Sequence, residues 1–561
     1  MVENQEKRER QLDEAKIEAM RVELRGLQDF LEERAISNVA QVAYSTDGCT
    51  FIYEAPLSLT LPVGSFVHLQ VSPDAAYLGQ IITKEIVQRE GAGISYQIDQ
   101  SFQDALPEWL NITETSGHLR IRALTGSGVI LGKIDGESYT PTSNMDSFQS
   151  ADISLADSTL VERYLVDTSY RKATLPIGKA LYVDGQVPMR LLSGGFNRHT
   201  FMCGQSGSGK TFSMGIVLEQ LLLNTDLRII IIDPNSDFVS LGHFRPLDEI
   251  NRFRSDIISE EAYQQLLEHY QRAIAGLRVF RPPAFADSPE NTLRVRFGDL
   301  SQQVQGSVLE LDPLQDREEF NAFWRLVESL GNQDYSWEEL RNAIGHSLTS
   351  EARQLALRIE NLGIADWEVW CAPGEQSLVQ TLNKDDWRCL VLDIGTLGSK
   401  AEKAIISNTV LNHFWMTRNQ RQPLLIVLDE AHNICPQEPA DEMHTILTEE
   451  VIRIAGEGRK FGLYLMLATQ RPSKIHSNVL SQCDNLMLMH MNSIADVAHL
   501  AAVLSHIPAS LLEQATNFGL GETLLAGRIV KNPSFAKFEG RLSEEGGSDI
   551  PTTWAKSGSQ E

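Results

Sequence analysis

The chain opens with a helical pattern. Across residues 1–36 charged residues are dense, proline is absent, and apolar residues recur at the three- to four-residue spacing of a helix, at Ile17, Met20, Leu24, Leu27 and Leu31. This pattern predicts one N-terminal helix. Two interpretations stay open, an amphipathic helix that lies on its own domain and an arm for oligomerisation or partner binding.

A period of two follows, in short segments rich in β-formers and separated by turn residues: 39–44, 49–53, 65–71, 77–86 and 94–98. This spacing predicts a small antiparallel barrel or sandwich within residues 37–190. Residues 137–158, rich in Ser, Thr and Asp, are expected to form an exposed loop, after which segments 160–166 and 180–183 would complete the barrel.

Continuous apolar runs then replace the alternation, as parallel strands buried on both faces require. The order strand, glycine loop, helix, strand over residues 191–244 predicts a doubly wound α/β core. We expect this core to resume over 386–540 after a helical insertion at 245–385, and the polar tail 541–561 to be a flexible or a strapping segment. The expected core strands are 200–203, 227–232, 389–394, 424–428, 463–468 and 485–490; the expected helices are 212–223, 260–277, 317–330, 337–362, 401–418 and one near 449–455.

Composition adds a compartment to this picture. The 561 residues are 42% hydrophobic and 22% charged, as in ordinary globular proteins. No apolar run is long enough to span a bilayer, and the charged N-terminus lacks a signal-peptide core, so a cytoplasmic protein without a membrane anchor is expected. The six cysteines are far apart and form no CxxC pair, which favours buried free thiols over a zinc site or disulfides.

The net charge of −26 weighs against nucleic-acid binding by an isolated subunit, because such surfaces are usually basic. It is compatible with a ring that is acidic outside and lined by a few Lys and Arg residues inside. An acidic exterior would also suit a basic protein partner.

One loop in the core carries recognisable chemistry. It has the pattern GxxxxGK[ST], formed by Gly204, Gln205, Ser206, Gly207, Ser208, Gly209, Lys210 and Thr211. Glycines let backbone N–H groups surround a phosphate at the start of a helix. Lys210 would contact the β- and γ-phosphates, and the Thr211 hydroxyl would bind Mg²⁺. The loop therefore predicts an ATP site.

A second strand supplies the acidic groups that such a site needs. The apolar run 424–428 ends at Asp429 and Glu430, and ligands of α/β sheets bind at the carboxyl ends of strands. Asp429 is expected to hold Mg²⁺, and Glu430 to polarise the water that attacks the γ-phosphate. This pair predicts an ATP hydrolase.

Further polar residues follow neighbouring strands. Gln470, just past strand 463–468, is expected to contact the attacking water and the γ-phosphate and to report the nucleotide state. Asp233, with Pro234, Asn235 and Asp237 after it, could orient Mg²⁺ or water or simply form a turn. A guanidinium from a neighbouring subunit often completes sites of this kind. The candidates are Arg198, Arg453, Arg459 and Arg471.

Together the segments GQSGSGKT, IIIIDPNSDF, VLDEAH, EGRKFGLYLMLATQRPSKI and VLSQCDNLM resemble the HerA family of hexameric DNA translocases, within the HerA/FtsK group of P-loop NTPases. The resemblance covers most of the chain from about 37 to 535, and the N-terminal helix and residues from about 99 to 157 fall outside it. It implies a RecA-like core, a preceding barrel of the HAS type, and a homo-hexamer that hydrolyses ATP with Mg²⁺ and moves double-stranded DNA through a central channel.

The resemblance also assigns residues and partners. Lys210 and Thr211 match the family's phosphate-loop pair, Asp429 and Glu430 its metal and catalytic acids, and Gln470 its polar sensor. Arg459 and Arg198 occupy places where the family carries arginines at subunit interfaces. The chain departs from the family at Asn235 and Asp237, where His and Glu are common.

Proteins similar to HerA work beside a nuclease, or beside sirtuin-like or restriction-nuclease effectors in antiviral defence. The acidic charge and the N-terminal helix favour the second setting. They also support an alternative function, an ATP-regulated hexameric scaffold that activates a nuclease or an NAD-consuming effector with little DNA translocation.

Overall fold

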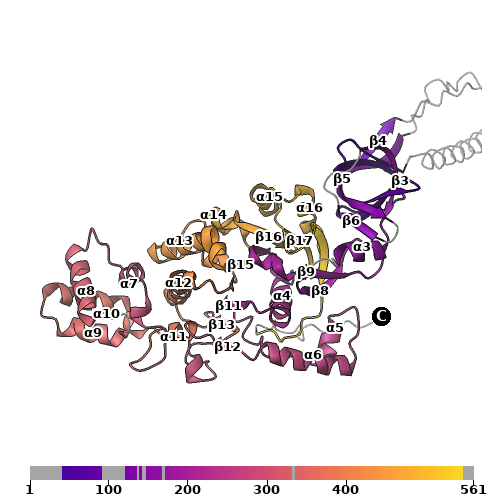
Figure 1. Cartoon of the computed structure of the whole chain (residues 1–561). Helices are drawn as coiled ribbons and strands as arrows, with labels where there is room; N and C mark the ends of the chain where they lie inside the picture. The colour runs from indigo at the N-terminus through magenta and orange to yellow at the C-terminus, as the bar shows by residue number, and fades with distance from the viewer. Residues whose placement is uncertain are drawn as a thin grey trace, which may run out of the picture. The chain divides into compact units, whose positions relative to one another are not determined.

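The computed structural model describes residues 41–90, 120–135, 138–141, 147–166, 171–331 and 335–546. They form two compact units (Figure 1). The first comprises the described residues up to Tyr164 together with Tyr182–Gly185, and the second comprises those of Leu165–Leu181 and those from Gln186 on. The predicted helix 1–36 and strand 94–98 lie outside the described residues.

The first unit is a closed antiparallel barrel. Its strands are β1 (Val42–Ser45), β2 (Thr50–Pro56), β3 (Phe66–Ser72), β4 (Ala75–Glu90), β5 (Arg120–Asp135), β6 (Ser138–Pro141) and β7 (Phe148–Leu155). They follow the order β2-β1-β7-β3-β4-β5-β6, and pairing of β5 with β2 closes the barrel. Alternate residues such as Phe51, Tyr53 and Leu69 fill the interior, as the period of two predicts.

Three details of the predicted barrel are wrong. Segment 160–166 is not a strand but belongs to helix α3 (Ser158–Leu165), whose buried Val161 and Tyr164 are three residues apart and share one face. The predicted loop 137–158 contains β6 and β7, and β7 lies between β1 and β3 in the barrel wall. Segment 180–183 follows β8 (Thr174–Ala180), which pairs with strands of the second unit.

The second unit is built on an eleven-stranded mixed sheet in the order β12-β13-β11-β14-β15-β10-β16-β17-β18-β8-β9. The strands from β12 to β16 in this order are parallel, and the others pair antiparallel. Their bounds are β9 (Pro188–Leu192), β10 (His199–Cys203), β11 (Arg228–Asp233), β12 (Leu277–Phe280), β13 (Cys389–Asp393), β14 (Leu424–Leu428), β15 (Leu463–Thr469), β16 (Cys483–Leu488), β17 (Glu522–Ala526) and β18 (Ser534–Phe538).

The central strands are buried on both faces, which explains their continuous apolar runs. Ile229 and Ile231 belong to the core cluster that includes Val217 and Leu221 of helix α4 (Lys210–Asn224). Ile230 and Ile232, on the opposite face, are equally inaccessible to solvent. Helices α12 (Lys400–Met416) and α13 (Glu442–Glu457) pack on one another, and α13 contacts β15. The predicted α/β core is confirmed.

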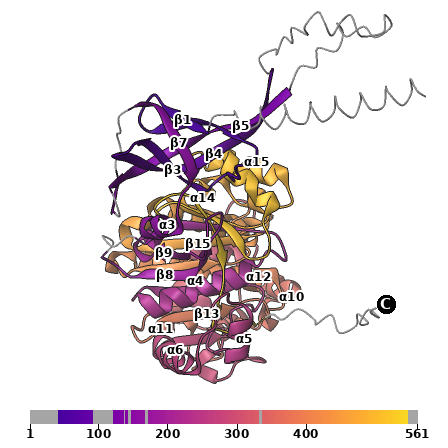
Figure 2. The same ribbon diagram turned by 90° about the vertical axis from the view of Figure 1, so that its right-hand side faces the viewer.

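The described residues between 245 and 385 form helices, irregular segments and one strand, β12. The helices are α5 (Leu247–Arg252), α6 (Glu260–Ala273), α7 (Gln302–Val308), α8 (Arg317–Leu330), α9 (Trp337–His346), α10 (Ser350–Leu362) and α11 (Leu378–Leu382). The predicted single helix 337–362 is two helices, and β12 joins the edge of the core sheet. Helices α7 to α10 cluster together (Figure 1), whereas α5 and α6 lie beside α4, which α6 contacts (Figure 2).

Helix α14 (Ser477–Leu480) precedes β16, and α15 (Ile494–Val503) and α16 (Ala509–Glu513) follow it. Of the two alternatives for the tail, residues 541–546 agree with a strapping segment and not with a flexible one. Arg541 is fully buried, and Phe244 and Ser543 form an antiparallel bridge. The side chains of these residues find buried partners, so this part of the tail is packed and not free.

Two compositional predictions can also be compared with the structure. Within the described ranges, no helix combines the length and apolar character needed to cross a membrane. Five cysteines, Cys203, Cys371, Cys389, Cys435 and Cys483, are buried free thiols as predicted, whereas Cys49 is exposed.

Candidate nucleotide site

The glycine loop lies between β10 and α4, at the carboxyl edge of the parallel strands. Gly207 and Gly209 have φ angles of +79° and +88°, the left-handed conformation that glycine adopts without strain. Helix α4 begins at Lys210 directly after Gly209. The N–H groups of a helix's first turn have no partner within the helix, so the loop and helix together can receive an anionic group.

Lys210 reaches from the loop to the two carboxylates at the end of β14. Its Nζ lies 2.8 Å from Asp429 Oδ1 and 3.3 Å from Glu430 Oε1. The ammonium is buried, which by itself lowers the pKa of Lys210, but the charges of Asp429 and Glu430 outweigh burial and raise it. The structure therefore brings together three of the predicted residues over a sequence separation of about 220.

Gln470 joins the same group because β15 lies between β10 and β14 in the sheet. Its Nε2 donates a hydrogen bond of 2.8 Å to Glu430 Oε1. On the other side, His432 Nδ1 lies 3.2 Å from Glu430 Oε2 and 3.0 Å from the Thr469 hydroxyl. Burial by itself raises the pKa of Glu430. Its partners His432, Lys210 and Gln470 lower the pKa by more than burial raises it, to about 2. Glu430 is therefore ionised at neutral pH.

The backbone at Glu430 is itself unusual. Its φ is +44°, in the left-handed region, which costs a residue with a side chain about 1–2 kcal/mol. The turn that follows, Ala431–Asn433, is a 3-10 helix that begins at this residue. Strain of this kind is retained where the surroundings fix it, and here it points the carboxylate at Lys210 and Gln470.

Two further acids follow β11, next to β14. Thr211 Oγ1 donates to Asp237 Oδ2 at 3.4 Å, so Asp237 lies beside the phosphate loop. Burial and the charge of Asp429 raise the pKa of Asp237 to about 6. Asp233 instead accepts the backbone N–H groups of Asn235, Asp237 and Phe238 at 3.1, 3.1 and 2.8 Å. This bonding fits the turn-forming interpretation of Asp233.

The donor set suits a magnesium ion. Mg²⁺ prefers carboxylate and hydroxyl oxygens and binds few protein groups at nucleotide sites. Asp429 is fully buried, and among the residues that the structure describes its Oδ2 finds no hydrogen-bond partner. A buried carboxylate oxygen without a partner is costly unless a cation uses it. Asp429 and the Thr211 hydroxyl would hold the ion, which would neutralise phosphate charge.

Arg198 and Arg459 do not join this group. Arg198 precedes β10 and Arg459 precedes β15, so both lie at the amino edge of the sheet, one strand length from the loop, or about 16 Å for five residues. Both contact Asp484 Oδ2, Arg198 Nε at 3.2 Å and Arg459 Nη1 at 2.9 Å. Neither guanidinium can serve the nucleotide site of its own subunit from this edge.

The remaining candidate arginines differ from each other. Arg453 pairs with Glu450 at 3.0 Å and lies over the ring of Trp415. Arg471 follows Gln470 and is exposed. Its position puts it at the carboxyl edge, beside the predicted sensor.

Sequence reasoning missed His432, Asp237 as a partner of Thr211, and the contacts made by Arg541. The signal for His432 was available, since it stands two residues after Glu430 on the same turn. Arg541 Nη1 donates to the Thr211 carbonyl at 3.3 Å across a separation of 330 residues. No local pattern could have indicated that contact.

The site has a glycine loop before a helix, and its lysine contacts two carboxylates at the end of β14. The amide of Gln470 follows β15, the strand between β10 and β14. This arrangement defines a P-loop ATPase. Comparison with known proteins narrows the class. Residues 175–363 match the family model described as "Helicase HerA, central domain". This match agrees with the resemblance seen in the motifs, and the residues of the site are those of an ATPase.

Curated relatives agree with this assignment. A probable helicase of Methanocaldococcus jannaschii is 34% identical over 136 residues, which cover 24% of this chain and 25% of that protein. The DNA double-strand break repair helicase HerA of Sulfurisphaera tokodaii is 23% identical over 67% of this chain and 72% of its own length. HerA of Sulfolobus acidocaldarius is 23% identical over 71% and 76%.

Among solved structures, VirB4 of Thermoanaerobacter pseudethanolicus matches 65% of this chain and 96% of its own, with 15% identity and a TM-score of 0.43.

Proposed function

We propose that the chain is the subunit of an ATP-hydrolysing ring motor that translocates or unwinds double-stranded DNA together with a partner nuclease or effector. The observation that supports it most is the convergence of Lys210, Asp429, Glu430 and Gln470 at one edge of the sheet. The relatives named as DNA double-strand break repair helicases support the DNA substrate.

Each side chain has a role in hydrolysis. The loop N–H groups and Lys210 bind the phosphates of ATP, and Thr211 and Asp429 hold Mg²⁺, which supplies charge neutralisation when bound. Glu430, ionised and fixed by Gln470 and His432, accepts a hydrogen bond from the attacking water and orients it toward the γ-phosphate. Gln470 then contacts both the water and the phosphate, and changes its bonding to Glu430 as the phosphate leaves.

The arginines give a reason for a ring. Arg198 and Arg459 lie at the amino edge of the sheet, far from the loop of their own subunit, and are partly exposed. In a head-to-tail ring this edge of one subunit can face the nucleotide of the next. We assign the two guanidiniums to the γ-phosphate of the neighbouring subunit, and six subunits as in the HerA family.

Lys210→Ala is expected to weaken nucleotide binding and to lower turnover by about 10²- to 10³-fold, the usual cost of removing one donor to developing negative charge. The variant also leaves Asp429 and Glu430 side by side without their cation. The measurements are the affinity for a fluorescent ADP analogue and the steady-state ATPase rate. Lys384→Ala, an exposed lysine before β13 at the amino edge, is the matched control and should match wild type. Normal binding by Lys210→Ala would contradict the assignment of the loop.

DNA binding by the purified protein is expected to fall steeply with salt. The subunit carries a charge of −26, so attraction to phosphates must come from a local basic surface, and each phosphate contact contributes about −0.9 to the slope of log K against log salt. Binding to a double-stranded fragment is measured between low and high salt, and ATPase activity with and without the fragment. Absence of DNA binding at low salt would contradict the motor.

The acidic charge favours a second candidate, an ATP-regulated scaffold that assembles and activates a nuclease or an NAD-consuming effector. It shares the nucleotide site with the motor. The same experiment separates them, because the scaffold predicts ATPase activity that DNA does not stimulate and that changes when the partner binds.

A further inference from the structure

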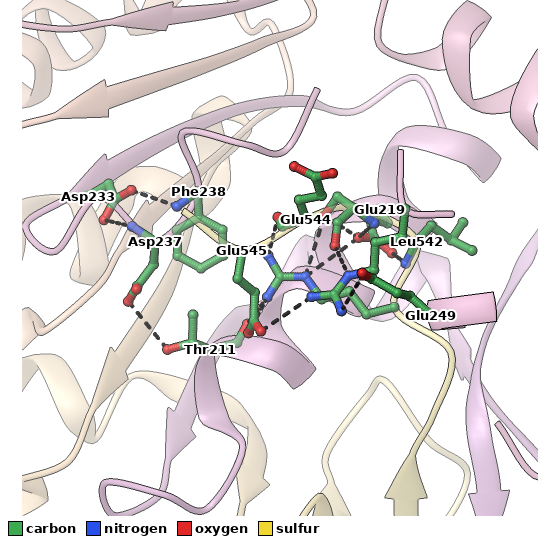
Figure 3. Close-up of polar contacts among 12 residues, drawn as sticks. Thr211, Glu219, Asp233, Asp237, Phe238, Glu249, Leu542, Glu544 and Glu545 are labelled. Atoms are coloured by element: carbon green, nitrogen blue, oxygen red, sulfur yellow. Dashed lines mark hydrogen bonds and ion pairs between the residues drawn. The ribbon is translucent and has the colours of Figure 1, made fainter. Parts of the chain in front are cut away.

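Residues 541–546, here called the C-terminal strap, lie along helix α4 one to two turns after the phosphate loop (Figure 3). The side chain of Arg541 is fully buried. Its guanidinium occupies the space over Gly215, where an added Cβ would lie 2.5 Å from Arg541 Nε. At this helical position only glycine leaves room for the guanidinium of Arg541. Glycine otherwise disfavours a helix, so the arginine explains why glycine stands here.

A buried carboxylate on the same helix fixes the strap. Glu219 accepts the backbone N–H groups of Leu542 at 2.9 Å and Ser543 at 2.8 Å, and lies 3.8 Å from Arg541 Nε. Burial raises the pKa of Glu219, and the charge of Arg541 opposes this effect. These directional bonds set the path of the strap residue by residue, which apolar packing alone would not do.

The strap is also held from its outer side. Arg245 Nε donates to the Ser543 carbonyl at 2.6 Å, and its Nη2 lies 3.3 Å from Glu545 Oε2. Glu545 Oε1 in turn accepts from Arg541 Nη1 at 2.8 Å. One glutamate therefore joins the two arginines, and the guanidinium of Arg541 has little freedom to move.

Both ends of the strap reach the nucleotide site. At one end Arg541 Nη1 donates to the Thr211 carbonyl at 3.3 Å. At the other end the Gly546 N–H donates to the Asp237 carbonyl at 3.1 Å. Thr211 and Asp237 are joined by their own hydrogen bond, from hydroxyl to carboxylate. The six residues of the strap therefore donate hydrogen bonds to the backbone carbonyls of Thr211 and Asp237. The side chains of Thr211 and Asp237 meet beside the loop (Figure 3).

We propose that Arg541 and the strap are positioning elements of the nucleotide site, which set the orientation of the Thr211 hydroxyl and of Asp237 for the magnesium-bound nucleotide. The inference rests on the proposed role of Thr211 as a magnesium ligand and does not depend on DNA movement. Groups that orient metal ligands typically change metal affinity or activity by about 10- to 100-fold when lost.

Gly215→Ala tests the proposal without removing a charge. The new methyl group displaces the guanidinium of Arg541 from α4, and alanine itself favours the helix. Gly345→Ala on α9 is the matched control, because a Cβ there meets nothing within 4 Å. The readout is the affinity for a fluorescent ADP analogue in EDTA and in Mg²⁺, together with the temperature of unfolding.

For wild type and Gly345→Ala we expect Mg²⁺ to strengthen ADP binding. For Gly215→Ala we expect this Mg²⁺-dependent gain to fall by about tenfold while binding in EDTA is retained. An unchanged gain in Gly215→Ala would overturn the role of the strap. A wild-type affinity that ignores Mg²⁺ would instead overturn the proposed role of Thr211, so the two failures are distinguishable.

A second variant covers the possibility that Gly215→Ala unfolds. Gly546→Ala leaves Arg541 and Glu219 untouched, but its Cβ would lie 2.0 Å from the Ser236 carbonyl oxygen and must displace the end of the strap from Asp237. The same loss of the Mg²⁺-dependent gain is expected, and a wild-type gain in this folded variant would overturn the proposal.

Discussion

Glu430→Gln is expected to bind ATP with an affinity close to that of wild type and to lower turnover by about 10²- to 10⁴-fold, the usual contribution of a positioned base. Glutamine has nearly the same shape and can still form a hydrogen bond with Gln470. Its amide is neutral, however, and cannot act as a base toward the attacking water. Lys210 remains in place to bind phosphate, and Asp429 remains in place to hold Mg²⁺. Equilibrium binding and single-turnover hydrolysis, measured side by side, separate the two effects.

The control for this variant is Glu338→Gln, which changes an exposed glutamate of α9 in the same way. It should hydrolyse ATP at the wild-type rate. Wild-type turnover by Glu430→Gln would show that another group polarises the water, and Asp237, beside Thr211, would be the next candidate.

Arg459→Ala is expected to lower turnover by about 10³-fold or more if its guanidinium reaches the γ-phosphate of a neighbouring subunit. The distinguishing measurement is complementation. Subunits with Arg459→Ala keep an intact loop, and subunits with Lys210→Ala keep an intact arginine. The two variants are mixed in equal amounts under conditions in which subunits exchange without unfolding. In a random head-to-tail ring, about a quarter of the interfaces then combine an intact loop with an intact arginine.

ATPase activity in the mixture well above that of either variant alone is therefore expected. A rate equal to the sum of the two variants would contradict action between subunits. Arg353→Ala, which removes an exposed arginine of α10, is the matched control and should keep wild-type activity in every mixture.

The sequence predicted the α/β core well because its strands and its glycine loop have local sequence signals. Strand 424–428 has the observed bounds, since a fully buried parallel strand must be apolar at every position. The glycine loop and the acidic pair could be placed on neighbouring strands because chain order and the ends of parallel strands constrain where they meet. The contacts of Lys210 with Asp429 and Glu430 are seen only in the folded chain.

The errors arose where distant pairing decides the structure. β8 reads as one more short strand after the barrel, yet it pairs with β18, more than 350 residues later. Segment 160–166 had a helical signal, because Asp157 accepts the Thr159 N–H and Val161 and Tyr164 are three residues apart. That signal was too short to outweigh the alternation before it. The break between α9 and α10 was marked by Thr349, which caps α10.

The sequence could not decide between the two alternatives for the tail, for a different reason. Its polar composition suits a flexible or a strapping segment, and Arg541 and Ser543 contact a buried carboxylate on α4 that no sequence pattern links to them. Polar residues can be held in one place when they pair with a buried charge of opposite sign. Only the folded chain shows where that charge lies.

That packing has a consequence for how damage to this enzyme would be distributed along its gene. Substitution of Arg541 changes no recognised motif, yet it leaves Glu219 buried on the phosphate-loop helix without its cation. A survey of inactivating mutations would therefore contain a group at residues 541–546, distinct from the groups at the loop and at the acidic strand. Its members would act on the nucleotide site from a part of the chain that motif searches pass over.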